Sequence, residues 1–380
     1  MEQVGDAALF LIGVAVVVST LISAIRTTVL PRGVSSRIGR QVFLWTRVVF
    51  RLRVGRSPSY EKRDRIMAMY APASLIALLT VWLVLLVAAY TAMFSAIGVE
   101  PLSRAFELSG SSIFTLGTTS TDTVFGDFLT YSEAGLGLLF LTLLITYLPT
   151  IYTTFQRREA SVTLLEVRAG NPPSAVNLLV RYHRIEKLDQ LNELWIQWEG
   201  WFAELEESHV SFPALAYFRS PQPDHSWITA AGTVLDAGSL WASTVEHPRD
   251  ADVQLCIRAG SLALRRIAAY FAVPFDADPA PDDPISISHY EYDEACRELA
   301  AAGVPLKDDL AAGWKSFAGW RVNYDTPLLN LARLTEAPIA AWTSDRSPVG
   351  PDRTWTFRRA FKGGTATNRG RRSYRRARES

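Results

Sequence analysis

The chain has 380 residues, 48% of them hydrophobic, and its 39 Lys and Arg nearly balance its 38 Asp and Glu. The balance hides a segregation of charge: residues 26–65 carry +9, 100–133 carry −4, 159–345 carry −13 and 346–380 carry +9. This segregation, together with only two cysteines, excludes an ordinary water-soluble globule, a disulfide-stapled secreted protein and a repeat protein.

Three uncharged apolar stretches are long enough to cross a bilayer. A helix rises about 1.5 Å per residue, so roughly 20 apolar residues span the ~30 Å hydrocarbon layer. The stretches are Ala7–Ile25, Ala73–Ile97 and Ala134–Phe155. Glu2 and Asp6 precede the first stretch and basic residues follow it, which is the reverse of a signal peptide, so we expect a retained anchor.

The placement of Lys and Arg predicts the orientation, because basic loops stay in the cytoplasm. Residues 26–65 hold eleven Lys and Arg against two acidic residues, and Arg157 and Arg158 follow the third stretch. We therefore expect a multi-pass protein of the cell membrane. Its N-terminus and residues 100–133 would lie outside, and everything after Phe155 would lie in the cytoplasm.

The basic stretch Ser36–Gly55 allows two interpretations. It holds arginines at near-helical spacing: Arg37, Arg40, Arg47 and Arg51. A voltage sensor would need this row on a helix that crosses the bilayer, and the stretch is too highly charged for that. We favour an interfacial amphipathic helix bound to anionic lipid of the inner leaflet. The basic tail 346–380 is poor in hydrophobic residues, so we expect it to be disordered and drawn to the same lipid, with no nucleic-acid partner.

The link between the second and third stretches, residues 100–133, predicts a re-entrant loop. Pro101 can begin a helix over Leu102–Phe114, and a Ser/Thr run with inserted glycines follows it. Polar backbone of this kind survives at membrane depth only where it lines a water-filled cavity. The order of elements therefore indicates a pore helix and a pore loop.

Residues Ser109–Gly117, Ser-Gly-Ser-Ser-Ile-Phe-Thr-Leu-Gly, resemble the end of the pore helix and the start of the selectivity filter in two-transmembrane, pore-loop potassium channels, including bacterial members of two-pore-domain type. The resemblance covers about Ala73–Arg158. It implies a pore for monovalent cations. One pore loop cannot enclose an axis, so the resemblance also implies a homo-oligomer, expected to be a tetramer.

Two registers fit the family pattern Thr-Val/Leu-Gly-Tyr-Gly-Asp. The first consists of Thr115, Leu116, Gly117, Thr118, Thr119 and the filter-end acid Asp122. The alternative consists of Thr123, Val124, Phe125, Gly126 and Asp127. We favour the first because it suits the distance from the pore helix. Thr119 then stands where the family has a second glycine, and a β-branched residue with positive φ is strained, so weak K⁺ selectivity is expected.

The third stretch carries a stripe of hydroxyls at spacings of 4, 4 and 3: Thr142, Thr146, Thr150 and Thr153. They either line an aqueous vestibule or bond back to carbonyls one turn earlier, and the pore loop upstream favours the vestibule. Pro149 removes a backbone hydrogen bond and predicts a kink where a gate could sit. Acidic residues near the outer mouth would concentrate cations. They are Glu100, Glu107, Asp122, Asp127 and Glu133.

The C-terminal half predicts an all-α cytoplasmic domain. Its longest pattern, Ser174–Glu207, reads as one helix with an aromatic stripe that we expect to contact other subunits. Further patterns cover Ile228–Val245, Asp252–Val273, His289–Ala302 and Leu306–Trp320, and Pro274–Pro284 reads as a linker. Nucleotide-binding, catalytic and metal-ligand signatures are missing, so we expect no enzyme, no cofactor and no metal.

The sequence thus predicts an all-α membrane protein with three transmembrane helices and a re-entrant pore helix and loop between the second and third. Residues 1–65 would form the anchor and interfacial helix, 66–158 the pore domain, 159–345 the cytoplasmic helical domain and 346–380 the tail. The predicted function is a cation-conducting, potassium-channel-like pore. The alternative is a non-conducting membrane sensor or scaffold with a channel-like fold.

Overall fold

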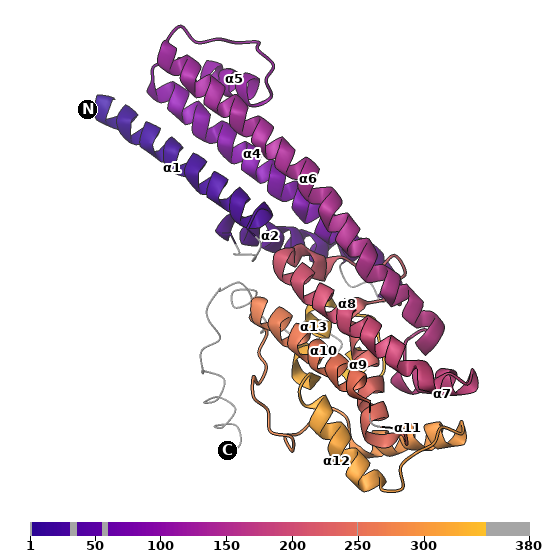
Figure 1. Cartoon of the computed structure of the whole chain (residues 1–380). Coiled ribbons are helices and arrows are strands. Elements are labelled where there is room, and N and C mark those ends of the chain that lie inside the picture. Colours follow the sequence, from indigo (N-terminus) through magenta and orange to yellow (C-terminus); the bar gives the residue numbers. More distant parts are fainter. Residues whose placement is uncertain (1, 31–35, 55–59, 249, 347–380) are drawn as a thin grey trace. The chain divides into compact units, whose positions relative to one another are not determined.

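The computed structural model describes residues 2–30, 36–54, 60–248 and 250–346 (Figure 1). The expected all-α class is confirmed, since the described residues form helices and contain no β-strand. Contacts divide the chain into two compact units. The first comprises Met1–Gly55 and Met69–Thr153, and the second comprises Arg56–Ala68 and Thr154–Ser380. The anchor and the pore segment, expected as separate domains, thus belong to one unit, and residues 56–68 belong with the C-terminal half.

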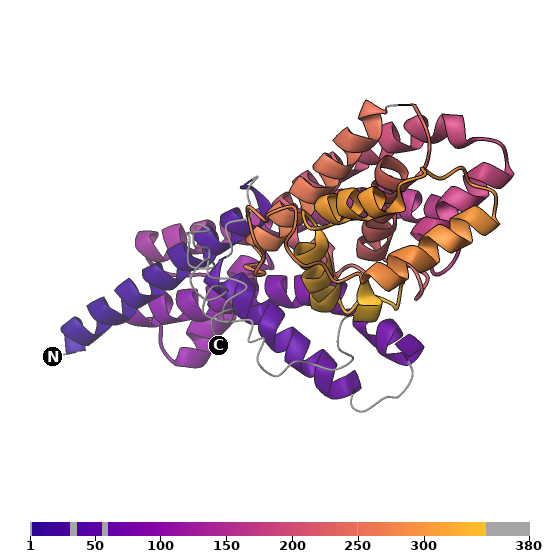
Figure 2. The same cartoon turned by 90° about the horizontal axis from the view of Figure 1, so that it is seen from below.

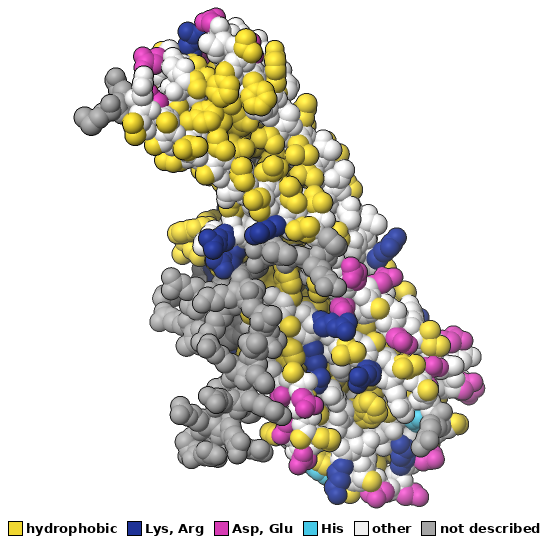
Figure 3. Space-filling view, turned by 60° about the vertical axis from the view of Figure 1, so that its left-hand side comes forward, with side chains coloured by type: hydrophobic (Ala, Val, Ile, Leu, Met, Phe, Trp, Pro, Cys, Tyr) yellow, Lys and Arg dark blue, Asp and Glu magenta, His cyan; other side chains and the backbone are white. Residues whose placement is uncertain are grey.

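Three helices are long and apolar enough to cross a membrane: Gln3–Thr28, Tyr60–Ala96 and Val124–Ala169. They correspond to α1 (Glu2–Thr28), to α3 (Tyr60–Ala68) followed by α4 (Tyr70–Ala96), and to α6 (Val124–Ala169). In the first unit, α1, α4 and the N-terminal part of α6 run side by side (Figure 1). Their outer surface in Figure 3 is mainly hydrophobic, and charged side chains gather at the end where α5 lies.

Close packing joins these helices. The indole of Trp82 on α4 donates a hydrogen bond to Ser23 Oγ of α1 at 3.1 Å and lies edge-on to Phe140 of α6 at 5.7 Å between ring centroids. At Gly13 of α1, an added Cβ would lie 2.9 Å from the carbonyl oxygen of Ala89 of α4. Only a glycine allows the two backbones to approach this closely.

The basic stretch forms α2 (Arg37–Val54), as expected, and Ser36 begins it by accepting the Gly39 N–H at 2.9 Å. One face of α2 packs on α4 through Val42. Another face consists of exposed apolar residues at helical spacing: Trp45, Val48, Val49 and Leu52. The helix is therefore apolar both where it packs on the unit and on part of its outer surface.

In the second unit, other helices lie around α9 (Trp227–Thr244) (Figure 2). Every residue of α9 is buried except Ala242. The other helices are α7 (Ala175–Arg184), α8 (Leu191–Ser211), α10 (Ala251–Tyr270), α11 (His289–Ala301), α12 (Leu310–Arg321) and α13 (Asp325–Thr335), with 3-10 turns η1 (Leu188–Gln190), η2 (Pro213–Tyr217) and η3 (Ser344–Arg346). Helices α7, α10, α12 and α13 contact α9. A helix that is apolar on all sides is stable in water only in such a central position.

The predicted helix Ser174–Glu207 is wrong, because the chain breaks between α7 and α8. Glu186 takes a left-handed φ of +56°, its N–H bonds to His183 O, and the Lys187 N–H bonds to Tyr182 O at 2.9 Å. These bonds form a Schellman cap, which ends helices and usually uses glycine. Since this cap has no glycine, the sequence pattern runs on across it.

The aromatic stripe of α8 lies in the core of the second unit rather than on its surface. Trp195, Trp198 and Trp201 are buried, and Trp198 and Trp201 lie 4.5 Å apart between ring centroids. These rings are covered by the unit itself, so the predicted role in subunit contacts is not available to them.

Three other expectations for the second unit need adjustment. Asp309 caps α12 by accepting the Ala312 N–H at 2.8 Å, so the helix begins later than expected. Helix α13 was not predicted. Arg346, the first residue of the expected tail, pairs with Glu291 of α11, and residues 347–380 lie outside the described residues.

A buried ionic network crosses the core of the second unit. Arg321 on α12 is completely buried and pairs with Asp236 on α9 at 2.5 Å and with Asp325 on α13 at 2.8 Å. Tyr324 also donates to Asp236 at 2.9 Å. Burial raises the pKa of Asp236 to about 6, against the opposing effect of the Arg321 charge.

Candidate functional site

The loop between α4 and α6 opens with the short helix α5 (Leu102–Ile113), close to the extent expected for a pore helix. The helix ends in a Schellman cap: the Leu116 N–H bonds to Ser111 O at 2.8 Å and the Thr115 N–H bonds to Ser112 O at 3.0 Å. Thr115 occupies the left-handed position of this cap with φ +54°. A threonine there is strained, because β-branched residues avoid positive φ.

After the cap, the chain runs exposed from Phe114 to Thr118 before α6 begins. Gly117 has φ +68°, and its missing Cβ would meet nothing within 4 Å. The Thr118 N–H bonds to Ser111 Oγ at 2.9 Å, which ties the loop back to α5. The left-handed residues therefore alternate, at positions 115 and 117.

The expectation that Thr119 takes a left-handed φ is wrong. Positive φ falls on Thr115 and Gly117, and Thr119 is not among the described residues that have it. Thr119 Oγ1 is buried and has no hydrogen-bond partner among the described residues. Strain therefore lies at the start of the candidate filter rather than at its end.

The alternative register, from Thr123 to Asp127, coincides with the start of α6. Thr123 Oγ1 accepts the Gly126 N–H at 3.1 Å, as an N-cap residue does, and Val124–Asp127 form the first helical turn. Thr121 Oγ1 donates to Asp127 Oδ1 at 2.6 Å. A helical turn keeps its carbonyls along its own axis, so this segment cannot present the extended row of carbonyls that a filter needs.

The acidic residues expected at the mouth separate into two groups. Glu100, Glu107 and Asp122 are exposed and Asp127 is half-buried. Glu133 is completely buried, so its assignment to an acidic ring is wrong. Its position three turns into α6 places it inside the unit.

Glu133 instead joins α6 to α5 behind the loop. Ser109 Oγ lies 2.5 Å from Glu133 Oε1 and 3.2 Å from Val87 O of α4, so one serine hydroxyl meets acceptors from both neighbouring helices. Glu133 Oε2 has no hydrogen-bond partner among the described residues. Beside it, Tyr90 of α4 and Ser132 of α6 share a hydrogen bond of 2.9 Å.

The C-terminal end of α5 rests on Gly137 of α6. A Cβ at Gly137 would lie 2.2 Å from Ile113 O, closer than real Cβ atoms come to a carbonyl. Sequence reasoning missed both Gly137 and the Ser109–Glu133 pair. A glycine inside a helical pattern was an available signal, since it often marks close backbone approach, whereas nothing local to Glu133 reveals its burial.

The predicted threonine stripe is exposed along α6 in the single chain. Each hydroxyl donates to the carbonyl four residues earlier: Thr142 to Leu138, Thr146 to Thr142, Thr150 to Thr146 and Thr153 to Pro149, at 2.8–3.0 Å. The two interpretations of the stripe are therefore compatible, because back-bonded hydroxyls still offer lone pairs to water. Pro149 is exposed, and α6 continues as one helix through it.

The described residues contain no group of three or more His, Cys, Asp or Glu that could hold a metal ion. No protein-family model, curated protein or solved structure matches the chain.

Proposed function

We propose that the protein is a cation channel whose pore is built by several copies of the chain, four by the resemblance, around one axis. The observation that carries the proposal is the exposed, non-helical Ser/Thr loop after α5, which belongs to a unit of apolar membrane-length helices. Polar backbone in such surroundings needs water or ions at its surface. An axis shared by several loops would supply both.

The chemistry of the loop suits dehydrated monovalent cations. Carbonyl oxygens of Leu116 and Gly117 and hydroxyls of Thr115, Thr118 and Thr119 would replace the water of hydration. In the loop as the structure describes it, Thr115 and Gly117 are the residues with left-handed conformation, so the row of carbonyl sites is short. We therefore expect weak discrimination of K⁺ from Na⁺. Glu100, Glu107 and Asp122 are exposed and would raise the local concentration of cations.

The surface of α6 supports assembly. The first unit leaves large apolar side chains of α6 exposed, including Val124, Phe125, Phe128, Leu138, Leu141 and Ile145. In an oligomer, lipid and neighbouring copies would cover these side chains, while the threonine stripe would line the vestibule below the loop. Pro149, within the stripe, lacks the backbone N–H that would hold this turn, so a gate is proposed there.

The outer apolar face of α2 supports contact with lipid. Trp45, Val48 and Leu52 are exposed on a helix that carries five arginines and no acidic residue. This combination suits a helix at the boundary of an anionic leaflet. It would place α2, and the chain after α6, on the cytoplasmic side.

The test is cation flux through the full-length protein in liposomes, with Gly117→Val as the lesion in the loop. Gly98 provides a matched control, because it also has positive φ (+91°) and open space around its missing Cβ. Both valines should strain the backbone equally, but only Gly117→Val should abolish flux, by crowding several chains at the axis.

Two outcomes would contradict the proposal. Equal loss in both variants would indicate general destabilisation rather than a constriction at the loop. Absence of flux in the wild-type protein under varied voltage, pH and lipid would favour the non-conducting sensor or scaffold. A strongly K⁺-selective reversal potential would contradict the short filter but not the channel function.

A further inference from the structure

One short segment of the second unit touches both helices that lead to the pore loop. We call Pro213–Ser220 the strap; it comprises η2 and the three residues after it, between α8 and α9. The unit's core fixes the strap: Trp227 Nε1 donates to Ala216 O at 3.4 Å, and the ring of Tyr217 lies edge-on to that of Phe271 at 5.8 Å. The strap therefore packs against the core of the second unit.

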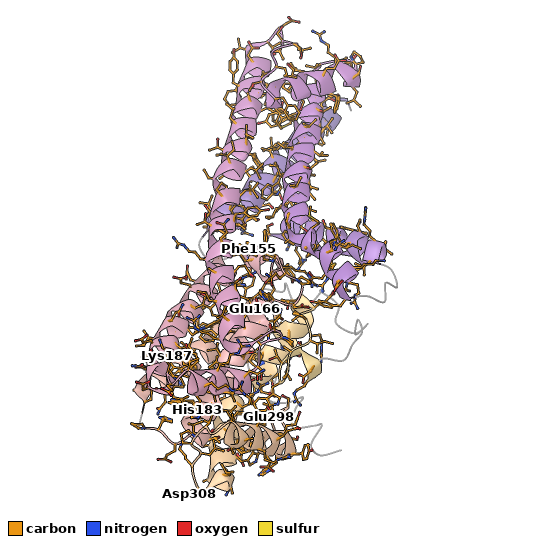
Figure 4. The ribbon with its side chains drawn as sticks, turned by 90° about the vertical axis from the view of Figure 1, so that its right-hand side faces the viewer. Phe155, Glu166, His183, Lys187, Glu298 and Asp308 are labelled. Atoms are coloured by element: carbon orange, nitrogen blue, oxygen red, sulfur yellow. The ribbon has the colours of Figure 1, made fainter. Side chains whose placement is uncertain are left out.

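The first contact of the strap is with α6. Arg158 is 4% exposed and donates to two strap carbonyls, from Nη1 to Leu215 O and from Nη2 to Phe218 O, both at 2.8 Å. One turn earlier, the ring of Phe155 lies 5.6 Å from that of Phe218. Figure 4 shows Phe155 on this C-terminal part of α6, with Glu166 further along the same helix. The guanidinium thus binds the strap by two parallel, charge-assisted hydrogen bonds.

Neighbouring groups fix the orientation of Arg158. Glu159 Oε1 accepts from its Nε at 2.9 Å, and His209 Nε2 lies 3.3 Å from its Nη1. His209 Nδ1 faces Leu205 O at 2.9 Å, so the ring donates there and accepts from Arg158. Burial, and then the charge of Arg158, hold the pKa of His209 well below its ordinary value, which keeps the ring a neutral acceptor.

The second contact of the strap is with α3. Arg219 pairs with Asp64 at 2.5 Å, and the two side chains are only 12% and 10% exposed. Arg219 Nη2 also donates to Thr335 O at 3.2 Å, so the same side chain caps α13. Next to it, Arg63 of α3 lies 4.0 Å from Glu336. The ion pair is therefore largely protected from solvent and from screening by salt.

Both helices continue without a break toward the loop. Met69, between α3 and α4, has helical dihedrals (φ −80°, ψ −9°), and Tyr60–Ala96 forms one helical run of 37 residues, charged in α3 and apolar in α4. Helix α6 is continuous from Val124 to Ala169 and includes Arg158. The helices that enter and leave the candidate pore loop thus each have one end on the strap.

We propose that the strap couples α3 to the C-terminal part of α6, the parts of the two helices that lie away from the loop. Through the strap, the second unit would control the opening of the pore. The regulatory part rests on the proposed channel function. In this proposal opening moves the two helices relative to each other. Stiff helices transmit a displacement of their ends, so a strap that holds both helices in one arrangement opposes that movement. Weakening either contact should therefore favour the open state.

The experiment uses the full-length protein in lipid nanodiscs for hydrogen exchange and in liposomes for cation flux. Asp64→Asn removes the charge of the α3 contact but leaves Arg219 to cap α13, so the fold should survive. Arg158→Gln weakens the α6 contact. Arg266→Gln is the control, because Arg266 forms an exposed ion pair with Glu206 in the same unit.

We expect Asp64→Asn to raise amide exchange in α3 and also in residues 155–162 of α6, although Asp64 does not touch α6. Exchange in α9 should stay unchanged. Basal flux should rise about tenfold, a factor typical of the coupling between two sites of one protein. The Arg266→Gln control should match wild type in both measurements.

Exchange that rises in α3 alone would overturn the coupling, whatever the flux. Exchange that rises in both helices with unchanged or lower flux would overturn the control of opening. If wild-type protein carries no flux, the channel function fails, and the exchange experiment still decides whether the strap joins the two helices.

Discussion

Helices α6 and α9 are both rich in apolar residues, but the surface of α9 is buried and much of the surface of α6 is exposed. Helix α9 is surrounded by four helices of its own unit and buries all but one residue. Helix α6 keeps Leu138, Leu141 and Ile145 exposed in the first unit. Apolar surface of this extent on a soluble monomer marks an interface or a membrane. The second unit thus covers its most apolar helix with its own helices, whereas the first leaves apolar surface of α6 uncovered.

The buried polar groups of the two units also differ in their partners. In the second unit, buried charges pair with one another, as Arg321 does with Asp236 and Asp325. In the first unit, several buried hydroxyls bond to the backbone of their own helix, as Thr20 does to Val16 O and Ser74 to Tyr70 O. Hydroxyls satisfied within one helix need no partner from water, which suits a helix that lies in lipid.

The largest effect expected from this comparison follows from Arg321→Ala. The change leaves Asp236 and Asp325 buried without their cation, so the second unit should lose about 3–5 kcal/mol of unfolding free energy. Intrinsic fluorescence during chemical unfolding in detergent measures it, because nine of the eleven tryptophans belong to the second unit. Arg266→Ala, at an exposed pair, should cost about 1 kcal/mol or less. Equal losses would mean that the buried network is no more important than a surface pair.

The next effect tests the first unit through two glycines on one helix. Gly137→Ala forces a Cβ against Ile113 O and should displace α5 at a cost of about 3 kcal/mol, the upper end for overpacking. Gly135→Ala meets nothing within 4 Å and should be neutral or stabilise by about 0.5 kcal/mol. The temperature at which the detergent-solubilised protein loses its monodisperse peak in size exclusion compares the two variants. A Gly137→Ala protein as stable as the Gly135→Ala protein would refute the close contact of α5 with α6.

The sequence predicted the elements whose signal is continuous along the chain. Membrane-length helices follow from composition over about 20 residues, and α2, α9, α10 and α11 follow from periodicity. Boundaries failed where the chain uses an unusual residue for a common cap. Glu186, which ends α7, occupies the left-handed position of a Schellman cap without being glycine. A cap of this kind cannot be recognised from the sequence, because it lacks the glycine that usually identifies it.

The candidate site was predictable in its position but not in its supports. Residues Thr115–Thr118 lie exposed between α5 and α6, where the sequence predicted a loop. Glu133 was assigned to the mouth because it is one of five acidic residues in the link 100–133, whereas its buried partner is Ser109, 24 residues away. The strap was equally hidden, since Arg158 meets carbonyls 57 and 60 residues further along the chain. Pairings over such distances have no local signal.

A smaller effect concerns Ser109 and Glu133. Ser109→Ala removes the hydroxyl from a buried carboxyl group and should cost about 2 kcal/mol, the cost of an unsatisfied buried polar group. The double variant Ser109→Ala/Glu133→Leu replaces both partners by apolar groups and should recover most of that loss. Thermal stability in detergent measures both variants. A double variant less stable than Ser109→Ala would show that Glu133 has another partner.

The smallest expected effect is a pH dependence of the second unit, centred on Glu291. Burial alone would raise the pKa of Glu291, but hydrogen bonds from Arg346 and Ser288 outweigh burial and lower the pKa to about 2. The folded-state pKa therefore lies below the ordinary carboxyl value of 4.5, so the interaction stabilises the fold above pH 4.5 and is lost as the pH falls from 4.5 to 2. The side chain is 30% exposed, so solvent screening should limit the contribution to about 1 kcal/mol.

Glu291→Gln should remove this dependence: wild type and variant should differ by a constant amount above pH 5 and converge toward pH 2 in chemical unfolding. Asp236, whose pKa is raised, changes stability in the opposite direction between about pH 4 and 6 in both proteins, so it cancels from the difference. A difference that does not change with pH would show that Arg346 does not pair with Glu291 in solution.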